Sequence, residues 1–322
     1  MYHTALHPLY EAWYPTYMIF RYEYRGGIWV DLEKPSPEEI RQIAREFSIN
    51  ERLEAEMLSP TPAPLAAGDE QMALVVLHFP AHERDGEGAK SQEIDFVVGN
   101  HFIVTVRYEV IVPLHHLKKM LEAQKLVGEQ EAIATDVLLE ILFAHLYTAV
   151  RNYTDHSAEN LGRVERDMFD GRERRTIREI SNVSREFLHL EAALANQEES
   201  LEHFLNMLTE RGFFGRSFSG RAARILAGRV QVGRLIKTYR AIATELRETN
   251  LALLEARQNE IMKTLTIVNF IFLPLGLISW IFAMRTEGMP LVDSPDAFWI
   301  VLALMFGVTV LLITFFIKRR WL

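Results

Sequence analysis

Two apolar runs near the C-terminal end restrict what this chain can fold into more than any other feature. Residues 265–284 read LTIVNFIFLPLGLISWIFAM and residues 298–317 read FWIVLALMFGVTVLLITFFI, with no charged residue in either. A helix of about 20 apolar residues spans the roughly 30 Å of hydrocarbon in a bilayer. Pro274 and Gly276 in the first run are tolerated in membrane helices. We therefore predict two transmembrane helices, with the lipid bilayer as a partner of the chain.

The charges that flank these runs predict the orientation of the helix pair. Cytoplasmic loops of membrane proteins carry an excess of Lys and Arg. Lys263 directly precedes the first run and a basic tail at 318–320 follows the second, whereas the connecting loop 285–297 carries more acids than bases. We predict that this loop faces outward and that both termini are cytoplasmic.

The composition excludes some partners and chemistries. The chain contains 43 acidic and 35 basic residues, a formal net charge of -8, and no cysteine. Because a nucleic-acid-binding protein is expected to carry a clustered basic face, we predict no nucleic-acid partner. The absence of cysteine fits a reducing cytoplasm and excludes disulfides and thiolate metal sites.

The segment 1–125 mixes strand and helix patterns and is predicted to form an α+β cytoplasmic domain. Ser36 and Glu39 predict a helix start, with Ser36 as the N-cap and Glu39 closing a capping box. The prolines within 60–64 predict a loop, and the charged, glycine-containing stretch 82–92 predicts a mobile hairpin tip. Alternation and β-branched residues predict strands at 28–32, 72–79, 94–98 and 102–106.

The rest of the chain is predicted to be helical. Apolar residues at three- and four-residue steps predict helices at 114–127, 129–169, 175–211 and 220–284. The predicted domains are a cytoplasmic helical hairpin at 126–219, a stalk that continues into the first transmembrane helix at 220–284, an external loop at 285–297, and the second transmembrane helix with its basic tail at 298–322. A two-helix hairpin cannot enclose a pore, so any pore must come from several copies in a ring.

Three stretches carry a resemblance to a known family. They are WVDL at 29–32 with Pro35, Ser36, Glu38 and Glu39, EIDFVVGNHFIVTV at 93–106, and NEIMKTLTI at 259–267 leading into FLPL at 272–275 and Met289-Pro290. With the two apolar runs, they resemble the CorA-type magnesium and divalent metal ion transporter superfamily over nearly the whole chain. The resemblance implies a funnel-shaped homopentamer whose first span lines the pore and whose second span faces lipid.

The resemblance also implies a function. The chain would be an inner-membrane channel or transporter for divalent metal cations, with Mg²⁺, or Co²⁺ or Zn²⁺, as the transported ion, and with no cofactor. No catalytic constellation points to an enzyme, and no residue is singled out as a metal ligand. The alternative is a divergent member that does not conduct Mg²⁺ and serves as an anion or nonselective pore, or as a membrane sensory or scaffold protein.

The family signature at the end of the first span, Gly-x-Asn, is altered in this sequence. By the resemblance, Ala283, Met284 and Arg285 stand at its three positions, and Glu287 follows at the outer mouth. The resemblance implies that the asparagine of other members binds the hydrated cation, whereas a guanidinium offers only donors and a fixed positive charge. Five arginines around one axis would favour anions unless acids such as Glu287 neutralise them. Alternatively, Arg285 anchors the helix end at lipid head groups.

One face of the first apolar helix is predicted to line the pore. Its residues recur every three or four positions, a seam that parallel helices in a ring would turn inward. They are Asn259, Met262, Thr266, Asn269, Leu273, Gly276 and Trp280. The resemblance places Asn259 and Met262 at family pore positions. Asn269 is interpreted as a polar ring in a wet pore, between hydrophobic constrictions at Met262 and Leu273; the alternative is an interhelical hydrogen bond that only holds the bundle together.

The stretch 216–240 is basic, which bears on regulation. The resemblance implies that carboxylates between subunits near the stalk sense Mg²⁺, an ion that needs oxygen ligands. Because Glu245 is the first acid of this stretch, we hypothesise that the usual regulatory site is lost or relocated and that the arginines face water or pair with acids of the preceding helix. Those acids are Glu191, Glu198, Glu199 and Glu202.

The histidines are interpreted as isolated side chains. Zinc-transporting branches of the family make four of them candidate zinc ligands, but their spacing does not bring them to one face of a helix or strand. They are His78, His82, His115 and His116.

Overall fold

The computed structural model describes residues 18–80, 91–127, 133–284 and 296–319, which form two compact units. Unit 1 comprises the described residues up to Asp170 together with Arg175–Leu246. Unit 2 comprises Gly171–Arg174 and the described residues from Arg247 onward. The boundary at 246 and 247 falls inside one long helix, α7 (Phe218–Ala283). The predicted domain boundaries stay predictions.

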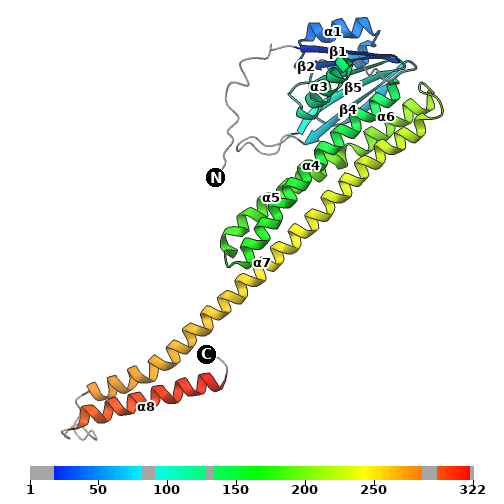
Figure 1. The fold of residues 1–322 in the computed structure, drawn as a ribbon. Helices are drawn as coiled ribbons and strands as arrows, with labels where there is room; N and C mark the ends of the chain where they lie inside the picture. Colours follow the sequence, from blue (N-terminus) through cyan, green and yellow to red (C-terminus); the bar gives the residue numbers. More distant parts are fainter. Residues whose placement is uncertain (1–17, 81–90, 128–132, 285–295, 320–322) are drawn as a thin grey trace. The chain divides into compact units, whose positions relative to one another are not determined.

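Unit 1 is built around a six-stranded mixed sheet with the order β1-β2-β6-β5-β4-β3 (Figure 1). Neighbouring strands are antiparallel except β2 and β6, which run parallel. The strands are β1 (Met18–Tyr24), β2 (Gly27–Glu33), β3 (Leu65–Gly68), β4 (Met72–Pro80), β5 (Ser91–Gly99) and β6 (Phe102–Arg107). The four predicted strands are confirmed as β2, β4, β5 and β6.

The sequence does not predict β1 and β3, which lie at the two edges of the sheet. β1 carries the charged residues Arg21 and Glu23, which are common on edge strands and weaken the strand pattern. β3 is only four residues long and reads LAAG, without a β-branched side chain. Most of the predicted hairpin tip, 82–92, lies outside the described residues, and its last two residues, Ser91 and Gln92, belong to β5.

Two short helices, α1 (Pro37–Glu46) and α2 (Glu51–Met57), cover one face of the sheet. The predicted capping box of α1 is confirmed, because the Glu39 N–H donates to the Ser36 hydroxyl at 3.3 Å and the Ser36 N–H donates to the Glu39 carboxylate at 2.7 Å. α2 is not predicted from the sequence. The core on this face is wholly apolar at its centre and includes Val30, Leu32, Ile40, Ile43, Leu53, Met57, Leu74, Val76, Val97, Val104 and Val106.

Three longer helices pack on the opposite face of the sheet or along β3 and β4. They are α3 (Val112–Val127), α4 (Thr135–Phe169) and α6 (Glu198–Glu210). Aromatic pairs join α4 to the sheet: the rings of Phe96 and Phe143 stack at 5.0 Å, and those of Phe79 and Tyr147 lie 5.7 Å apart. Unit 1 is therefore a three-layer α+β fold, which confirms the predicted class of its first half.

The predicted helix at 129–169 begins later, at Thr135. Ala134 is extended, and the Thr135 hydroxyl donates to the Gly26 carbonyl at 3.4 Å, where the chain passes the β1–β2 turn. Residues 128–132 lie outside the described residues. The start of α4 therefore coincides with this contact to the β1–β2 turn.

The single helix predicted at 175–211 is wrong, because a break at Gln197 divides it into α5 (Glu173–Asn196) and α6. Gln197 is fully buried. Its side-chain amide donates to the backbone carbonyl of His78 in β4, and its carbonyl accepts a hydrogen bond from the Tyr147 hydroxyl at 3.3 Å. A periodic apolar stripe continues through such a break, so the pattern alone does not reveal it.

A buried ion network joins β2, β6 and α3. Asp31 and Arg107 are fully buried, and Nη2 of Arg107 lies 3.1 Å from Oδ2 of Asp31. Lys118 of α3 forms a second ion pair with Asp31, and the Thr105 hydroxyl donates to the same carboxylate at 2.6 Å. Burial alone would raise the pKa of Asp31, but the two neighbouring cations outweigh it and lower that pKa. Asp31 is thus held ionised inside the sheet layer.

The basic stretch of α7 within unit 1 pairs with acids, as hypothesised. Two of the predicted partners are confirmed: Arg229 contacts Glu198 at 2.5 Å, and Arg240 contacts Glu191. Arg221 instead bridges two acids of α4, with its Nε 2.7 Å from Asp136 and its Nη1 3.0 Å from Glu140. Arg224 also pairs with Glu140. The sequence could not assign these partners because α4 lies more than 80 residues away.

Replacing Arg221 with Met is expected to destabilise unit 1 more than replacing Arg240 with Met. Asp136 is buried and would lose its cation, at a cost of about 1–3 kcal/mol for an unsatisfied charged group. The Arg240–Glu191 pair is more exposed, so its loss is expected to cost less than about 1 kcal/mol. Thermal unfolding of the two variants in the same detergent measures the difference. Equal shifts would show that burial of Asp136 does not matter.

Candidate pore-lining site

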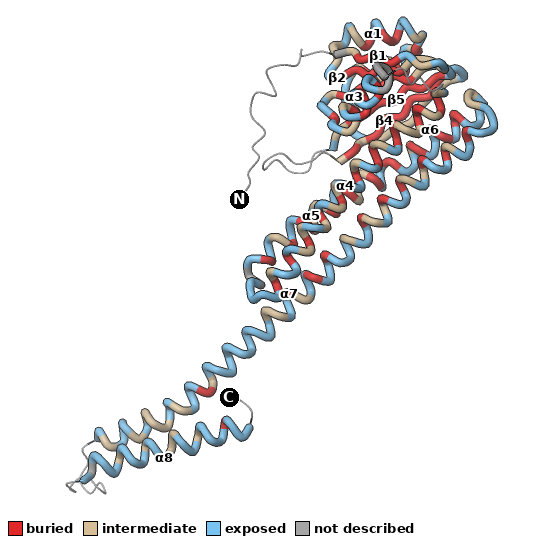
Figure 2. The backbone as a smooth tube through the Cα atoms, viewed as in Figure 1, coloured by how far each residue is buried: buried red, intermediate tan, exposed pale blue. Residues whose placement is uncertain are grey.

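Unit 2 contains both predicted transmembrane helices. They are the second half of α7 and α8 (Ala297–Lys318). Each is long and apolar enough to cross a membrane, and only 6% of each apolar window is buried (Figure 2). The core helix of a soluble protein would be mostly buried. Exposed apolar surface on this scale requires a bilayer or further copies of the chain to cover it.

α7 stays helical through its apolar half despite Pro274. A proline removes one backbone donor and frees the carbonyl one turn earlier.

The Thr266 side chain makes its hydrogen bond within α7, because its hydroxyl donates to the Met262 carbonyl at 2.7 Å. Hydroxyls that bond to their own helix can lie in an apolar environment without a further partner.

α8 lies along one side of α7. The rings of Phe270 and Phe316 are 6.3 Å apart, and the Ser279 hydroxyl lies 3.8 Å from the Met305 sulfur. Ile267 is 6% exposed and Leu275 lines a shallow groove with residues of α8, so both belong to the covered side.

The predicted seam lies on the side of α7 away from α8. Successive helix positions turn by about 100°, which places the seam positions roughly opposite Ile267 and Leu275. Met262 is 53% exposed, and Leu273 and Trp280 are each 72% exposed. Asn259 and Asn269 are also exposed, whereas Thr266 and Gly276 are half-buried. The structure therefore keeps the seam on one uncovered face, and its role as a pore lining stays a prediction.

Asn269 is the polar residue of this face within the apolar half. Its carboxamide makes no hydrogen bond to any other residue in the described part of the chain. An amide in a membrane span is costly unless it meets water or a partner. The Asn269 carboxamide therefore needs a polar partner from outside the described part of the chain.

The predicted outer mouth is only partly within the described residues. Ala283 is the last residue of α7, and the Met284 N–H still donates to the Trp280 carbonyl at 3.2 Å. Arg285 and Glu287 lie outside the described residues. Helix α7 thus ends at the altered signature, and the roles of Arg285 and Glu287 stay predictions.

Comparisons with known proteins fit this arrangement. A family model described as CorA-like Mg²⁺ transporter protein matches residues 24–319, nearly the whole chain. The chain belongs to the CorA-like Mg²⁺ transporter family. It is 22% identical over 303 residues to the cobalt/magnesium transport protein CorA of Methanocaldococcus jannaschii, covering 92% of this chain and 91% of that protein.

Solved structures show the same fold. The complete CorA magnesium transporter structure from M. jannaschii matches with a TM-score of 0.77 and 21% identity over 94% of each chain. The ZntB cytoplasmic domain from Vibrio parahaemolyticus matches with a TM-score of 0.57 and 11% identity, covering 72% of this chain and 89% of that domain. The predicted α+β domain, long helix and two C-terminal apolar helices are confirmed as a CorA fold.

Membership of the CorA-like family confirms that the chain is a membrane protein and an ion transporter, not an enzyme. The comparisons support a divalent cation channel and do not favour the alternative of a divergent pore or scaffold. They leave the pore residues and the outer mouth untested. The comparisons are consistent with the predicted self-association of the chain.

No group of three or more His, Asp or Glu side chains within the described ranges is arranged to hold a metal ion. His78, predicted to be isolated, in fact contacts Glu93 at 3.4 Å. His82 lies outside the described residues.

Proposed function

We propose that this chain is a homopentameric inner-membrane channel for hydrated divalent cations, with Mg²⁺ as the main transported ion and Co²⁺ or Zn²⁺ as further candidates. The observation that carries the proposal is the family match over 24–319, together with the cobalt/magnesium transport protein as a relative over most of both chains. The ion is cargo, and no resident cofactor is proposed.

The proposed pore is formed by the α7 seam of each subunit. A ring of α7 helices would turn the uncovered seam face inward and leave α8 on the lipid side, because α8 packs on the opposite side of α7. Asn269 would supply a polar ring, and Met262 and Leu273 would form apolar constrictions that gate by dewetting. A ring also supplies the polar partner that Asn269 needs.

The proposed orientation follows the charges at the helix ends. Lys318 and Arg319 close α8, and Lys263 precedes the apolar half of α7, so these ends would lie in the cytoplasm. Unit 1 would then be cytoplasmic and the loop 285–295 external.

Asn269→Leu is expected to lower Mg²⁺ uptake into proteoliposomes by roughly fivefold, which corresponds to a net loss of about 1 kcal/mol when the whole ring of amides no longer contacts the ion's water shell. The change keeps the number and branching of the side-chain heavy atoms and removes the amide. Thr314→Val is the matched control, because it removes a polar group from α8, where the Thr314 hydroxyl bonds only to the Val310 carbonyl.

A fluorescent Mg²⁺ indicator inside the liposomes measures the initial rate, with Co²⁺ and chloride compared in parallel. If Asn269→Leu and Thr314→Val leave the rate equally unchanged, Asn269 does not face the ion path. If the parent protein passes chloride and no divalent cation, the proposed function itself is wrong.

A further inference from the structure

A buried carboxyl group on β5 lacks any partner. Asp95 is 0% exposed, and neither of its oxygens makes a hydrogen bond within the described part of the chain. An ionised carboxylate in such a place would be strongly destabilising, so it must be neutral or balanced by a bound cation. The proposed pore does not involve this group, which lies in unit 1.

The nearest titratable neighbour of Asp95 is another acid. Glu93 lies two positions earlier on β5, so both side chains point to the same face of the sheet. Glu93 is fully engaged: it accepts from the Thr61 N–H at 2.8 Å and from the Thr61 hydroxyl at 3.2 Å, and it contacts Nε2 of His78 at 3.4 Å. These contacts fix the position of the Glu93 carboxylate beside Asp95.

The other groups that face Asp95 bring no positive charge to it. Glu56 of α2 adds a further negative charge, and Tyr108, which follows β6, is neutral and donates its hydroxyl to the Met57 carbonyl at 2.9 Å. His78 of β4 is the base of the cluster, and it contacts Glu93. Two acids, a tyrosine and one histidine therefore meet at this end of the sheet.

We propose that Asp95 and Glu93 share one proton and, with His78, form a proton-responsive site in unit 1. A proton is favoured over a metal ion because the described residues contain no group of three His, Asp or Glu side chains arranged for a metal. The shared proton makes Asp95 a donor toward Glu93 and removes the repulsion between two carboxylates, as in acid pairs elsewhere.

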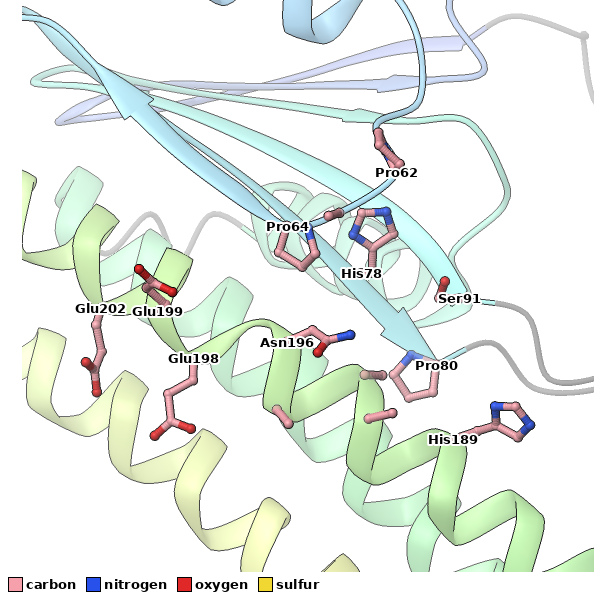
Figure 3. A pocket seen from close by; sticks show the side chains of 14 residues that line it. Pro62, Pro64, His78, Pro80, Ser91, His189, Asn196, Glu198, Glu199 and Glu202 are labelled. Carbon is pink, nitrogen blue, oxygen red and sulfur yellow. The ribbon is translucent and has the colours of Figure 1, made fainter.

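His78 links this site to a pocket beside β4. Its ring lines a pocket of about 910 Å³ at the junction of β4 with α5 and α6, together with Pro64, Asn196 and Glu198 (Figure 3). The imidazole contacts Glu93 on its inner side. The same Nε2 lies 3.0 Å from the Thr61 carbonyl, and Nδ1 is buried without a hydrogen-bond partner. The backbone carbonyl of His78 accepts from Gln197 at the break between α5 and α6, so His78 connects the acid pair to this pocket wall.

Unit 1 should become less stable as the pH rises and the cluster loses its protons. Burial and the charge of Glu93 raise the pKa of Asp95 well above that of an aspartate in the unfolded chain, about 3.9. The folded state then binds more protons than the unfolded state above that pH, so stability falls with rising pH. The pKa of His78 is also raised, mainly by its bond to Glu93, and its contribution is lost as pH rises through that value.

Infrared difference spectroscopy on the full chain in nanodiscs tests the proposal. A protonated carboxylic acid has its own C=O stretching band, which is expected to persist at neutral pH in the parent and to disappear in Asp95→Asn. Glu93→Gln is expected to lower the titration midpoint of this band by about one pH unit or more, because it removes the negative neighbour. Asp155→Asn, an exposed acid on α4, is the matched control and should leave the band unchanged.

Thermal unfolding gives a second readout that a purely structural role would not produce. Asp95→Asn should raise the melting temperature relative to the parent at about pH 8, and the gain should shrink toward about pH 5. Absence of the band at neutral pH would overturn the proposal. A second result would also overturn it: added Mg²⁺ or Ca²⁺ abolishes the band and stabilises the parent but not Asp95→Asn. That result would mean that the cluster binds a metal ion.

Discussion

Arg285→Asn is expected to raise the rate of Mg²⁺ uptake into proteoliposomes by at least about tenfold over the parent, because it removes five positive charges from the proposed outer mouth. At about 8 Å, one guanidinium repels a divalent ion by about 1 kcal/mol even at the dielectric constant of water. Five such terms add, and screening at physiological ionic strength reduces but does not cancel them. The substitution also restores the asparagine of the family signature.

Two further variants distinguish the effect of the positive charge at position 285 from the effect of the asparagine side chain itself. Arg285→Lys keeps the charge and should behave like the parent, and Glu287→Gln removes the nearest acid and should lower Mg²⁺ uptake further. If all three variants match the parent, Arg285 does not lie near the ion path. Arg285 would then be better explained as an anchor at the lipid head groups.

Asp31→Ala is expected to destabilise unit 1 by about 3–5 kcal/mol, the usual effect of removing one partner from a buried ion network. Arg107 and Lys118 would be left as two buried cations, with Glu33 the remaining acid against Arg107. Because the pKa of Asp31 is lowered in the folded state, its contribution is present above the unfolded pKa of about 3.9 and is lost as the pH falls through the folded pKa.

Denaturant unfolding of the full chain in detergent at neutral pH measures this effect. Glu46→Ala is the matched control, since it breaks the exposed pair of Glu46 with Arg21 and should cost less than about 1 kcal/mol. A small loss for Asp31→Ala, similar to that of the control, would show that water enters and solvates the two cations.

The broad fold was predictable because its strongest signals are local. The length and apolar character of 265–284 and 298–317 predict membrane helices without any tertiary information. The capping box at Ser36 and the alternation in β4, β5 and β6 are also local, and the structure confirms them.

The missed features depend on contacts between distant residues. The break at Gln197 depends on a bond to His78, 119 residues earlier. The partners of Arg221 lie on α4, and the start of α4 coincides with a contact to Gly26. Asp95 left a visible signal in EIDFVV, an acid at an inward-facing strand position beside another acid, but only the structure shows that its oxygens have no partner. The seam of α7 was predictable as one helix face from its spacing, and its place away from α8 agrees with the arrangement that the resemblance implies.

The strand β3 is too short to pair with the whole length of its neighbour β4. β3 pairs only with Ala73–Val76 of β4, so the rest of β4 up to Pro80 would present an open strand edge. Such edges invite strands of other molecules to add to the sheet. Gln197 occupies the free carbonyl of His78, and Pro80 offers no donor at the end of the strand. The irregular joint between α5 and α6 thus occupies part of the strand edge that β3 leaves uncovered, where another strand could otherwise add.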